Sequence, residues 1–283
     1  MKTVVVCLLL TMIAGCHRTS HVQTGEQEYS YPAHRIISLA PSITELVYAA
    51  GAGKYLVGTV DYSDYPDAAK SLPHVGDALR VDMERVLALK PDLILVWPSG
   101  TPASVLEQVK KLDVPVHEID AQRIAEVSDA LRLIGNLAGT GDVAGNAAAQ
   151  FENDMNALRA QYAGRSRLSV FIQVNDQPLY TVNKQQIISE IVELCGGDNI
   201  FADLNQLAPV IGVEAVIQKN PQVILSTDSH AVDLETQWHA WPQLQAVKSH
   251  HLYTVPPDNI ARASPRLVKG TKEVCDALDK ARL

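Results

Sequence analysis

Aromatic and polar side chains follow several of the predicted strands, and their chemistry suits non-covalent binding of a ligand. Four such stretches occur, at residues 61–66, 97–100, 175–176 and 258–262. Tyrosine and tryptophan combine flat apolar area with a polar tip, which suits a large planar ligand. In α/β proteins, ligands bind beyond the carboxyl ends of parallel strands. The set therefore predicts a ligand-binding cleft, although each aromatic residue taken alone fits a half-buried structural role equally well.

The sequence lacks the short motifs of common catalytic sites. It contains no G-x-S-x-G, H-E-x-x-H, C-x-x-C or Walker pattern. Residues 139–144 fit G-x-G-x-x-A, but they follow a predicted helix, where a dinucleotide-binding motif requires a strand. We interpret them as a turn between helices. The only adjacent histidines, His250 and His251, would face opposite sides of a strand. The sequence therefore predicts a protein that is not an enzyme and has no metal site.

Composition excludes two further classes of protein. The chain has 283 residues, 47% of them hydrophobic and 20% charged, which is typical of a folded protein and excludes a disordered one. With 24 basic and 32 acidic residues the formal net charge is −8. A surface that neutralises many phosphates is not expected from such a balance, so no nucleic-acid partner is predicted.

The first 33 residues carry the features of an exported protein. Lys2 precedes the apolar run 4–10, which is shorter than the ~20 residues that a membrane span needs. Small residues then lead directly to Cys16, as in the cleavage site of bacterial lipoproteins. We predict a signal peptide over residues 1–15, lipidation of Cys16 and a flexible polar tether over residues 16–33. The alternative is a plain signal peptide that ends near a chance cysteine.

The remaining cysteines agree with export. If Cys7 leaves with the signal peptide and Cys16 carries lipid, Cys195 and Cys275 are left as a pair. In an oxidising compartment we expect them to form a disulfide. Two buried thiols are the alternative.

Two pairs of similar segments indicate an internal duplication. Residues 44–51 resemble residues 189–196, at an offset of 145, and residues 84–95 resemble residues 214–225, at an offset of 130. The order of the segments is the same in both halves. The chain therefore predicts two similar lobes, of which the first has 15 additional residues between its two segments, the difference between the offsets.

The pattern of helices and strands predicts the architecture of these lobes. The runs 93–96 and 223–225 are continuously apolar, as in strands buried on both faces of a parallel sheet. Further strands are predicted at residues 35–39, 55–60, 114–119, 169–173 and 252–255. Helices are predicted at residues 124–138 and 143–162, and residues 236–244 form a predicted helix in which Trp238 and Trp241 serve in packing.

We therefore expect an α/β protein with two Rossmann-like lobes of parallel strands, joined by a long helix. The expected boundaries are residues 34–141 for the first lobe, 142–165 for the connecting helix and 166–283 for the second lobe. A single long helix bends little, so only small movements of the lobes are expected.

Four motifs give the chain a resemblance to a known family. They are Arg-Ile-Ile-Ser-Leu-Ala-Pro-Ser-Ile-Thr-Glu at 35–45, Asp-Tyr-Ser-Asp-Tyr-Pro at 61–66, Met-Glu-Arg through Lys-Pro-Asp at 83–92, and Arg-Ala-Ser-Pro-Arg at 262–266. Across residues 34–280 the chain resembles the cobalamin-binding members of the substrate-binding proteins of ABC importers. The first and third motifs are shared with haem and siderophore binders, whereas the second and fourth narrow the resemblance to corrinoid binders.

The resemblance implies a fold, a ligand and a set of partners. The fold is the class III periplasmic binding protein, the transported ligand is cobalamin or a related corrinoid, and the partner is the permease of an ABC importer. The protein would be a monomer in the periplasm, held at a membrane through its lipid. The alternative ligand within the same superfamily is haem or a ferric siderophore.

The resemblance also implies roles for particular residues. The ligand-binding residues would be Tyr62, Trp97, Asp258, Asn259, Ile260, Ala261 and Arg262. Glu84 and Glu214, one in each lobe, would engage arginines of the permease; in structural terms they are also acids in the first turn of a helix, where the helix dipole favours them. Cys195 and Cys275 match cysteines that form a disulfide in related binders.

The chain departs from this family at three positions. Related cobalamin binders have tryptophans in the loop before each glutamate-bearing helix and before the Arg-Ala-Ser-Pro motif. This chain has Ala78, Ala208 and Asn259 near those places.

Overall fold

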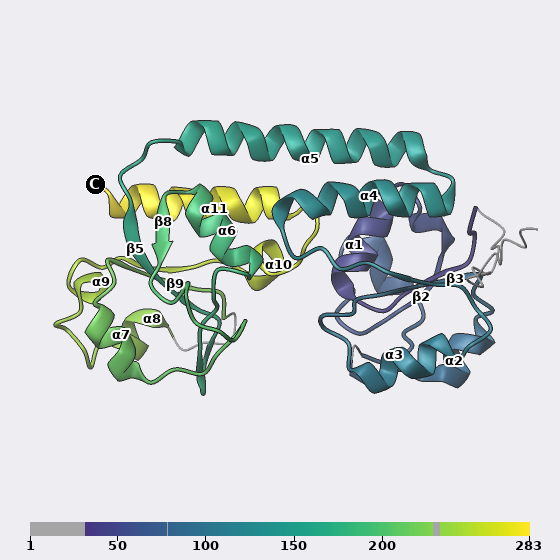
Figure 1. The fold of residues 1–283 in the computed structure, drawn as a ribbon, viewed down its shortest axis with the longest axis horizontal. Helices are drawn as coiled ribbons and strands as arrows, with labels where there is room; N and C mark the ends of the chain where they lie inside the picture. The colour runs from purple at the N-terminus through teal and green to yellow at the C-terminus, as the bar shows by residue number, and fades with distance from the viewer. Residues whose placement is uncertain (1–31, 78, 229–232) are drawn as a thin grey trace, which may run out of the picture. The chain divides into compact units, whose positions relative to one another are not determined.

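Two four-stranded parallel sheets form the framework of the protein (Figure 1). The computed structural model describes residues 32–77, 79–228 and 233–283, all of which belong to one compact unit. The predicted signal peptide, Cys16 and all but the last two residues of the predicted tether lie outside the described residues. Within the described ranges, no helix is both long and apolar enough to cross a membrane.

The first sheet has the strand order β2-β1-β3-β4, and all of its pairs are parallel. Its strands are β1 (Ile36–Ser38), β2 (Leu56–Thr59), β3 (Leu93–Val96) and β4 (Val116–Glu118). Leu93 and Leu95 of β3 pack into one hydrophobic core, and Ile94 and Val96 pack into another. Both faces of β3 are therefore buried, as its uninterrupted apolar run predicts.

Helices cover both faces of this sheet. They are α1 (Pro41–Ala49), η1 (Gly53–Tyr55), η2 (Asp67–Ser71), α2 (Met83–Ala88) and α3 (Ala103–Lys110). The buried apolar side chains of α1 belong to the first core, whereas Val86 of α2 and Val105 of α3 belong to the second.

The second sheet has the order β10-β9-β5-β8 and is also parallel throughout. Its strands are β5 (Leu168–Gln173), β8 (Gly197–Asn199), β9 (Val223–Ser226) and β10 (Leu252–Thr254). A hairpin of β6 (Asn175–Asp176) and β7 (Leu179–Tyr180) follows β5. The remaining elements are α6 (Ile187–Leu194), α7 (Val213–Lys219), α8 (Leu234–Trp238), α9 (Gln245–Lys248), α10 (Pro257–Ile260) and α11 (Leu267–Ala281).

The two sheets repeat one topology. If β5, β8, β9 and β10 are matched in turn to β1, β2, β3 and β4, the spatial order of the strands is identical. The backbone repeats as well: Gly51 and Gly196, which directly follow the C-cap residues of α1 and α6, have φ angles of 79° and 78°. Lys90 and Asn220, which precede β3 and β9, have φ angles of 48° and 44°. The duplication seen in the sequence is therefore present in the fold.

A layer of long helices joins the two lobes (Figure 1). α4 (Ile124–Ala138) ends at Gly139, whose φ of 67° is the left-handed conformation typical of a helix end, and α5 (Gly141–Tyr162) begins two residues later. Residues 139–144 are thus a turn between helices and the start of a helix, as predicted. α5 has 22 residues, a length of about 33 Å at ~1.5 Å per residue. It packs along α4 and α11, and side chains from both lobes share one continuous core beneath it.

The predicted fold class is confirmed, and several details differ from the expectation. The helix expected over residues 236–244 ends at Trp238, because a helix continued through Pro242 would lose a backbone hydrogen bond and place the proline ring against the carbonyl of Trp238. Trp238 does serve in packing: it is buried, and its indole N–H donates to the side chain of Gln173 at 3.0 Å. The hairpin and β8 were not expected, since they are two or three residues long and mostly polar. The expected lobe boundaries, 34–141, 142–165 and 166–283, stay predictions.

Candidate functional site

A cleft with a volume of about 770 Å³ lies between the two lobes. Much of its wall comes from residues that directly follow strands. Trp97 and Ile119 follow β3 and β4 of the first lobe, and Val174 and Thr227 follow β5 and β9 of the second. The carboxyl ends of both sheets therefore face the cleft, as the sequence predicts, and its volume lies within the roughly 300–1,000 Å³ range of ligand pockets.

Two equivalent helices present their first turns to this cleft. Pro41 and Ser42 open α1 in the first lobe, and Ile187 and Ile188 open α6 in the second; all four line the cleft. Because α1 and α6 are matched by the duplication, the cleft is built from the same parts of both lobes.

The cleft is mainly apolar and carries little charge. Of the described residues that line it, only Asp228, Asp258 and Arg262 have charged side chains. Two carboxylates against one guanidinium give a formal charge of −1. A ligand with several carboxylates would therefore meet no excess of positive charge, whereas a ligand with neutral polar groups meets no repulsion.

Trp97 supplies the flat apolar surface that the sequence predicts at the cleft. Its side chain lines the cleft, and the residue remains 36% exposed. Gly100 accepts the ring: a Cβ atom at this position would lie 2.0 Å from the indole, so no other residue fits without moving it. Gly100 thus leaves the space in which the indole of Trp97 lies.

Only some of the residues in the stretch 258–262 line the cleft. Asp258, Ala261 and Arg262 line the cleft, but Asn259 and Ile260 do not. Ile260 is fully buried in the core, and the Asn259 side-chain amide donates to Glu273 at 3.1 Å. The cause is α10, since successive residues of a helix point about 100° apart and only one face meets the cleft.

Tyr62 is not among the residues that line the cleft. It has a φ of 65° and is 78% exposed. The sequence places it after β2, but the turn directs its ring into solvent. Of the three positions where related cobalamin binders have tryptophan, Ala208 lines the cleft, Asn259 is buried, and Ala78 lies outside the described residues.

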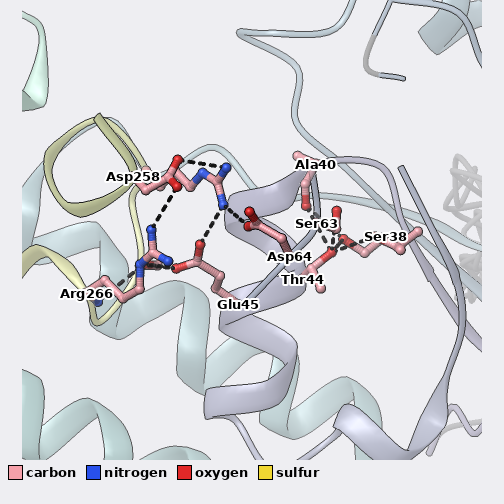
Figure 2. A network of polar contacts seen from close by, with 11 residues as sticks. Ser38, Ala40, Thr44, Glu45, Ser63, Asp64, Asp258 and Arg266 are labelled. Carbon is pink, nitrogen blue, oxygen red and sulfur yellow. Dashed lines mark hydrogen bonds and ion pairs between the residues drawn. The ribbon is translucent and has the colours of Figure 1, made fainter. Parts of the chain in front are cut away.

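A cross-lobe network of charged side chains lies beside the cleft (Figure 2). Glu45 of α1, only 3% exposed, accepts hydrogen bonds from Arg262 Nη1 at 3.0 Å and from Ser264 Oγ at 2.6 Å. Arg262 also contacts Asp64 of the first lobe at 3.1 Å and Asp258 at 2.8 Å. Arg266 approaches Glu45 at 3.4 Å and completes the cross-lobe network.

Burial and pairing have opposite effects on the titration of the cross-lobe network. Burial raises the pKa of the Glu45 carboxyl, and the hydrogen bond from Ser264 and the charges of Arg266 and Arg262 oppose that shift without cancelling it. Burial alone would lower the pKa of Arg262, but its contacts with Glu45 and Asp258 outweigh burial and raise it.

Buried hydroxyl groups hold the loop after β2 against α1. Thr44 Oγ1 lies 2.9 Å from Ser38 Oγ, 2.8 Å from Thr59 Oγ1 and 3.2 Å from Ser63 Oγ. Figure 2 shows this cluster next to Glu45 and Asp64. These hydrogen bonds hold the loop in the position where Asp64 contacts Arg262 of the second lobe.

The motifs at 61–66 and 262–266 contact each other across the lobes. Besides the contact of Asp64 with Arg262, the guanidinium of Arg266 lies 4.6 Å from the ring centre of Tyr65, a cation–π distance. The two motifs that narrow the resemblance to corrinoid binders thus form one structural unit.

Cys195 and Cys275 are joined by a disulfide. Cys195 is the C-cap residue of α6, Cys275 lies in α11, and both are fully buried. The bond closes a separation of 80 residues within the second lobe.

Glu84 and Glu214 occupy equivalent places, in the first turns of α2 and α7. Both are exposed. In the part of the chain that the structure describes, neither carboxylate has a hydrogen-bond or ion-pair partner. Each lobe therefore presents one free carboxylate at the same point of its fold.

Sequence reasoning missed two groups of residues at this site. Gln122, Gln185 and Gln186 line the cleft, but they lie in connections or at a helix start that no strand pattern marks. Glu45 is the last residue of the motif at 35–45, and the sequence alone predicts no role for its side chain. Its match with Glu190 in the duplication was the available signal that both glutamates hold equivalent positions.

Comparison with known proteins agrees with the fold. Residues 36–259 match the periplasmic binding protein family. A vitamin B12-binding protein of Yersinia pestis is 39% identical over 248 residues, which are 87% of this chain and 86% of the relative. The crystal structure of the periplasmic vitamin B12 binding protein of Vibrio cholerae is 35% identical, with a TM-score of 0.84 over 89% of this chain and 99% of that one.

A more distant likeness shows the fold alone. A periplasmic haem-binding protein from Pseudomonas aeruginosa has a TM-score of 0.76 at 21% identity, over 87% of this chain and 92% of that one. The match over residues 36–259 covers most of the chain, and the two lobes, the long helix and the cleft between them agree with it. This chain therefore belongs to the periplasmic binding protein family.

Proposed function

We propose that this protein captures cobalamin or a related corrinoid in the cleft and delivers it to an ABC importer. The observation that carries the proposal is the apolar cleft of about 770 Å³ between two matched lobes. Relatives that are 35–39% identical over nearly the whole chain are vitamin B12-binding proteins.

The charge of the cleft supports a corrinoid over haem or a ferric siderophore. Cobalamin carries most of its peripheral polar groups as neutral amides, whereas haem carries carboxylates and many siderophore chelates are anionic. Arg262 is the only cationic residue among the described residues that line the cleft, and Glu45, Asp64 and Asp258 already surround it. Little positive charge remains for an anionic ligand.

In this proposal, different residues of the cleft contact different parts of the ligand. Trp97 packs its indole against the macrocycle. Asp258 and Arg262 meet polar groups at the rim of the ligand, and Ala261 leaves room between them. Tyr62, exposed on a neighbouring loop, is a contact that only a bound ligand would complete, whereas Asn259 and Ile260 support α10 from the core.

In delivery of the ligand to the importer, the two free carboxylates would contact the permease. Glu84 and Glu214 would each engage an arginine of the permease, one from each lobe, so that the permease grips both lobes. The signal peptide would export the protein to the oxidising periplasm, which agrees with the disulfide between Cys195 and Cys275. Lipidation at Cys16 would hold it at a membrane. The protein acts as a lipid-anchored monomer, and binding without catalysis is its activity.

Calorimetry tests this function directly. The full chain is titrated at micromolar concentration with cyanocobalamin, haem and a ferric siderophore in separate experiments. We expect a single site for cyanocobalamin and weaker or no binding of the other two. No heat with cyanocobalamin, together with tight binding of haem or the siderophore, would contradict the proposal.

A further inference from the structure

Each lobe sends one glutamate to the other lobe, and the two glutamates are equivalent in the duplication. Glu45 and Glu190 are 145 positions apart, which is the offset between the repeated segments. Glu45 lies on α1, between β1 and β2, and Glu190 lies on α6, between the matching strands β5 and β8. Both side chains are largely buried, with 2% and 19% of their surface exposed.

Glu45 binds the segment that follows the last strand of the second lobe. Its partners Arg262, Ser264 and Arg266 lie between α10 and the first turn of α11. Figure 2 shows the carboxylate of Glu45 directed at Arg266.

Glu190 makes the matching contact in the opposite direction. Its Oε2 atom accepts from Arg123 Nε and from the backbone N–H of Ile124, both at 3.0 Å. Arg123 lies between β4, the last strand of the first sheet in chain order, and α4, and Ile124 is the first residue of α4. In both lobes, then, the helix after the first strand reaches the segment after the fourth strand of the other lobe.

Both contacts lie directly behind the walls of the cleft. Pro41 and Ser42 precede Glu45 on α1, and Ile187 and Ile188 precede Glu190 on α6; these four residues line the cleft. Glu45 and Glu190 themselves are not among its lining residues. Each glutamate therefore acts on the cleft through the helix that carries it, and Glu45 acts also through Arg262, which lines the cleft.

We propose that Glu45 and Glu190 are a pair of cross-lobe latches: positioning residues that hold the cleft at the width its ligand requires. A cleft fixed in advance avoids the loss of conformational freedom that closing two mobile lobes would require. The inference rests on the proposed function only for the identity of the ligand.

A distance measurement tests the latches without any ligand. Spin labels are attached to a keto amino acid placed at Glu107 on α3 and at Lys248 on α9, which are exposed and lie in different lobes. Pulsed electron paramagnetic resonance on the full chain then gives the distribution of distances between the lobes. We expect Glu190→Ala and Glu45→Gln to broaden this distribution about twofold each, and more in combination.

The matched control is Glu193→Ala. Glu193 lies on the same helix as Glu190, is exposed, and has no side-chain hydrogen bond or ion pair among the described residues. Its distribution should coincide with that of the unsubstituted protein. If Glu45→Gln fails to fold, Glu190→Ala alone decides, because its latch is the more exposed of the two.

Affinity for cyanocobalamin shows whether the latches serve binding. We expect Glu190→Ala to raise the Kd about tenfold although Glu190 does not line the cleft, and Glu193→Ala to leave it unchanged. Unchanged distance distributions in folded Glu190→Ala and Glu45→Gln would overturn the latches. Broadened distributions with an unchanged Kd would overturn their role in binding. Absence of cyanocobalamin binding by the unsubstituted protein would instead contradict the proposed function, and the distances would still decide the latches.

Discussion

Removal of the indole of Trp97 should weaken corrinoid binding by an amount that follows from its exposure. Of the ~250 Å² that a tryptophan can bury, 36% remains exposed at Trp97, which leaves about 90 Å² for a ligand to cover. At ~25 cal/mol per Å², covering that surface is worth about 2 kcal/mol. Trp97→Ala should therefore raise the Kd for cyanocobalamin by roughly thirtyfold, measured by calorimetry.

Two further variants separate a direct contact from a general effect. Trp241→Ala is the matched control, because Trp241 packs on Trp238 at a ring distance of 5.4 Å and is not among the cleft-lining residues. Gly100→Ala keeps the indole but displaces it, and should weaken binding in the same direction. A direct contact between the indole and the ligand is refuted if Trp97→Ala binds cyanocobalamin with a Kd within about twofold of that of the unsubstituted protein, or if Trp241→Ala loses as much affinity as Trp97→Ala.

Three other outcomes are expected. Replacing Cys195 and Cys275 together by serine should lower the free energy of unfolding by about 4 kcal/mol, since the bond closes a separation of 80 residues; a loss below about 1 kcal/mol in denaturant titration would contradict this. Burial lowers the pKa of His117 below its ordinary 6.5, so the unfolded chain binds the proton more readily and stability should fall as the pH drops just below that value; His117→Asn should flatten this dependence, and parallel curves for the two proteins would disprove it. Reversing the charge of Glu84 and Glu214 with lysine should abolish stimulation of the importer's ATPase while cobalamin affinity is unchanged, and an unaffected ATPase would count against the docking role.

The elements with strong local signals were predictable from the sequence. β3 has the bounds that its apolar run predicts, and α4 covers the predicted residues 124–138. Trp97 and Arg262 were expected at the cleft because residues beyond parallel strands meet at one edge of a sheet. In these cases the information lies in the residues themselves or in their near neighbours.

The remaining features depend on contacts between distant parts of the chain. The contact of Glu45 with Arg262 joins residues 217 positions apart, and it exists only once the lobes have docked. Asn259 and Ile260 turn away from the cleft because residues 257–260 form a helical turn that was not predicted. Position 100 favours glycine because the indole of Trp97 lies where a Cβ atom would be, and nothing in the spacing of the sequence predicts that contact.

The visible absorption spectrum of the protein tests the central claim most directly. The full chain is produced in cells supplied with both cobalamin and haem, purified without added ligand, and its spectrum is recorded. We expect a pink protein with corrin absorption bands at about one ligand per chain, and loss of these bands in a variant whose cleft is filled by Ala261→Trp together with Ser42→Trp. A haem spectrum, or a colourless protein from the same cells, would contradict it.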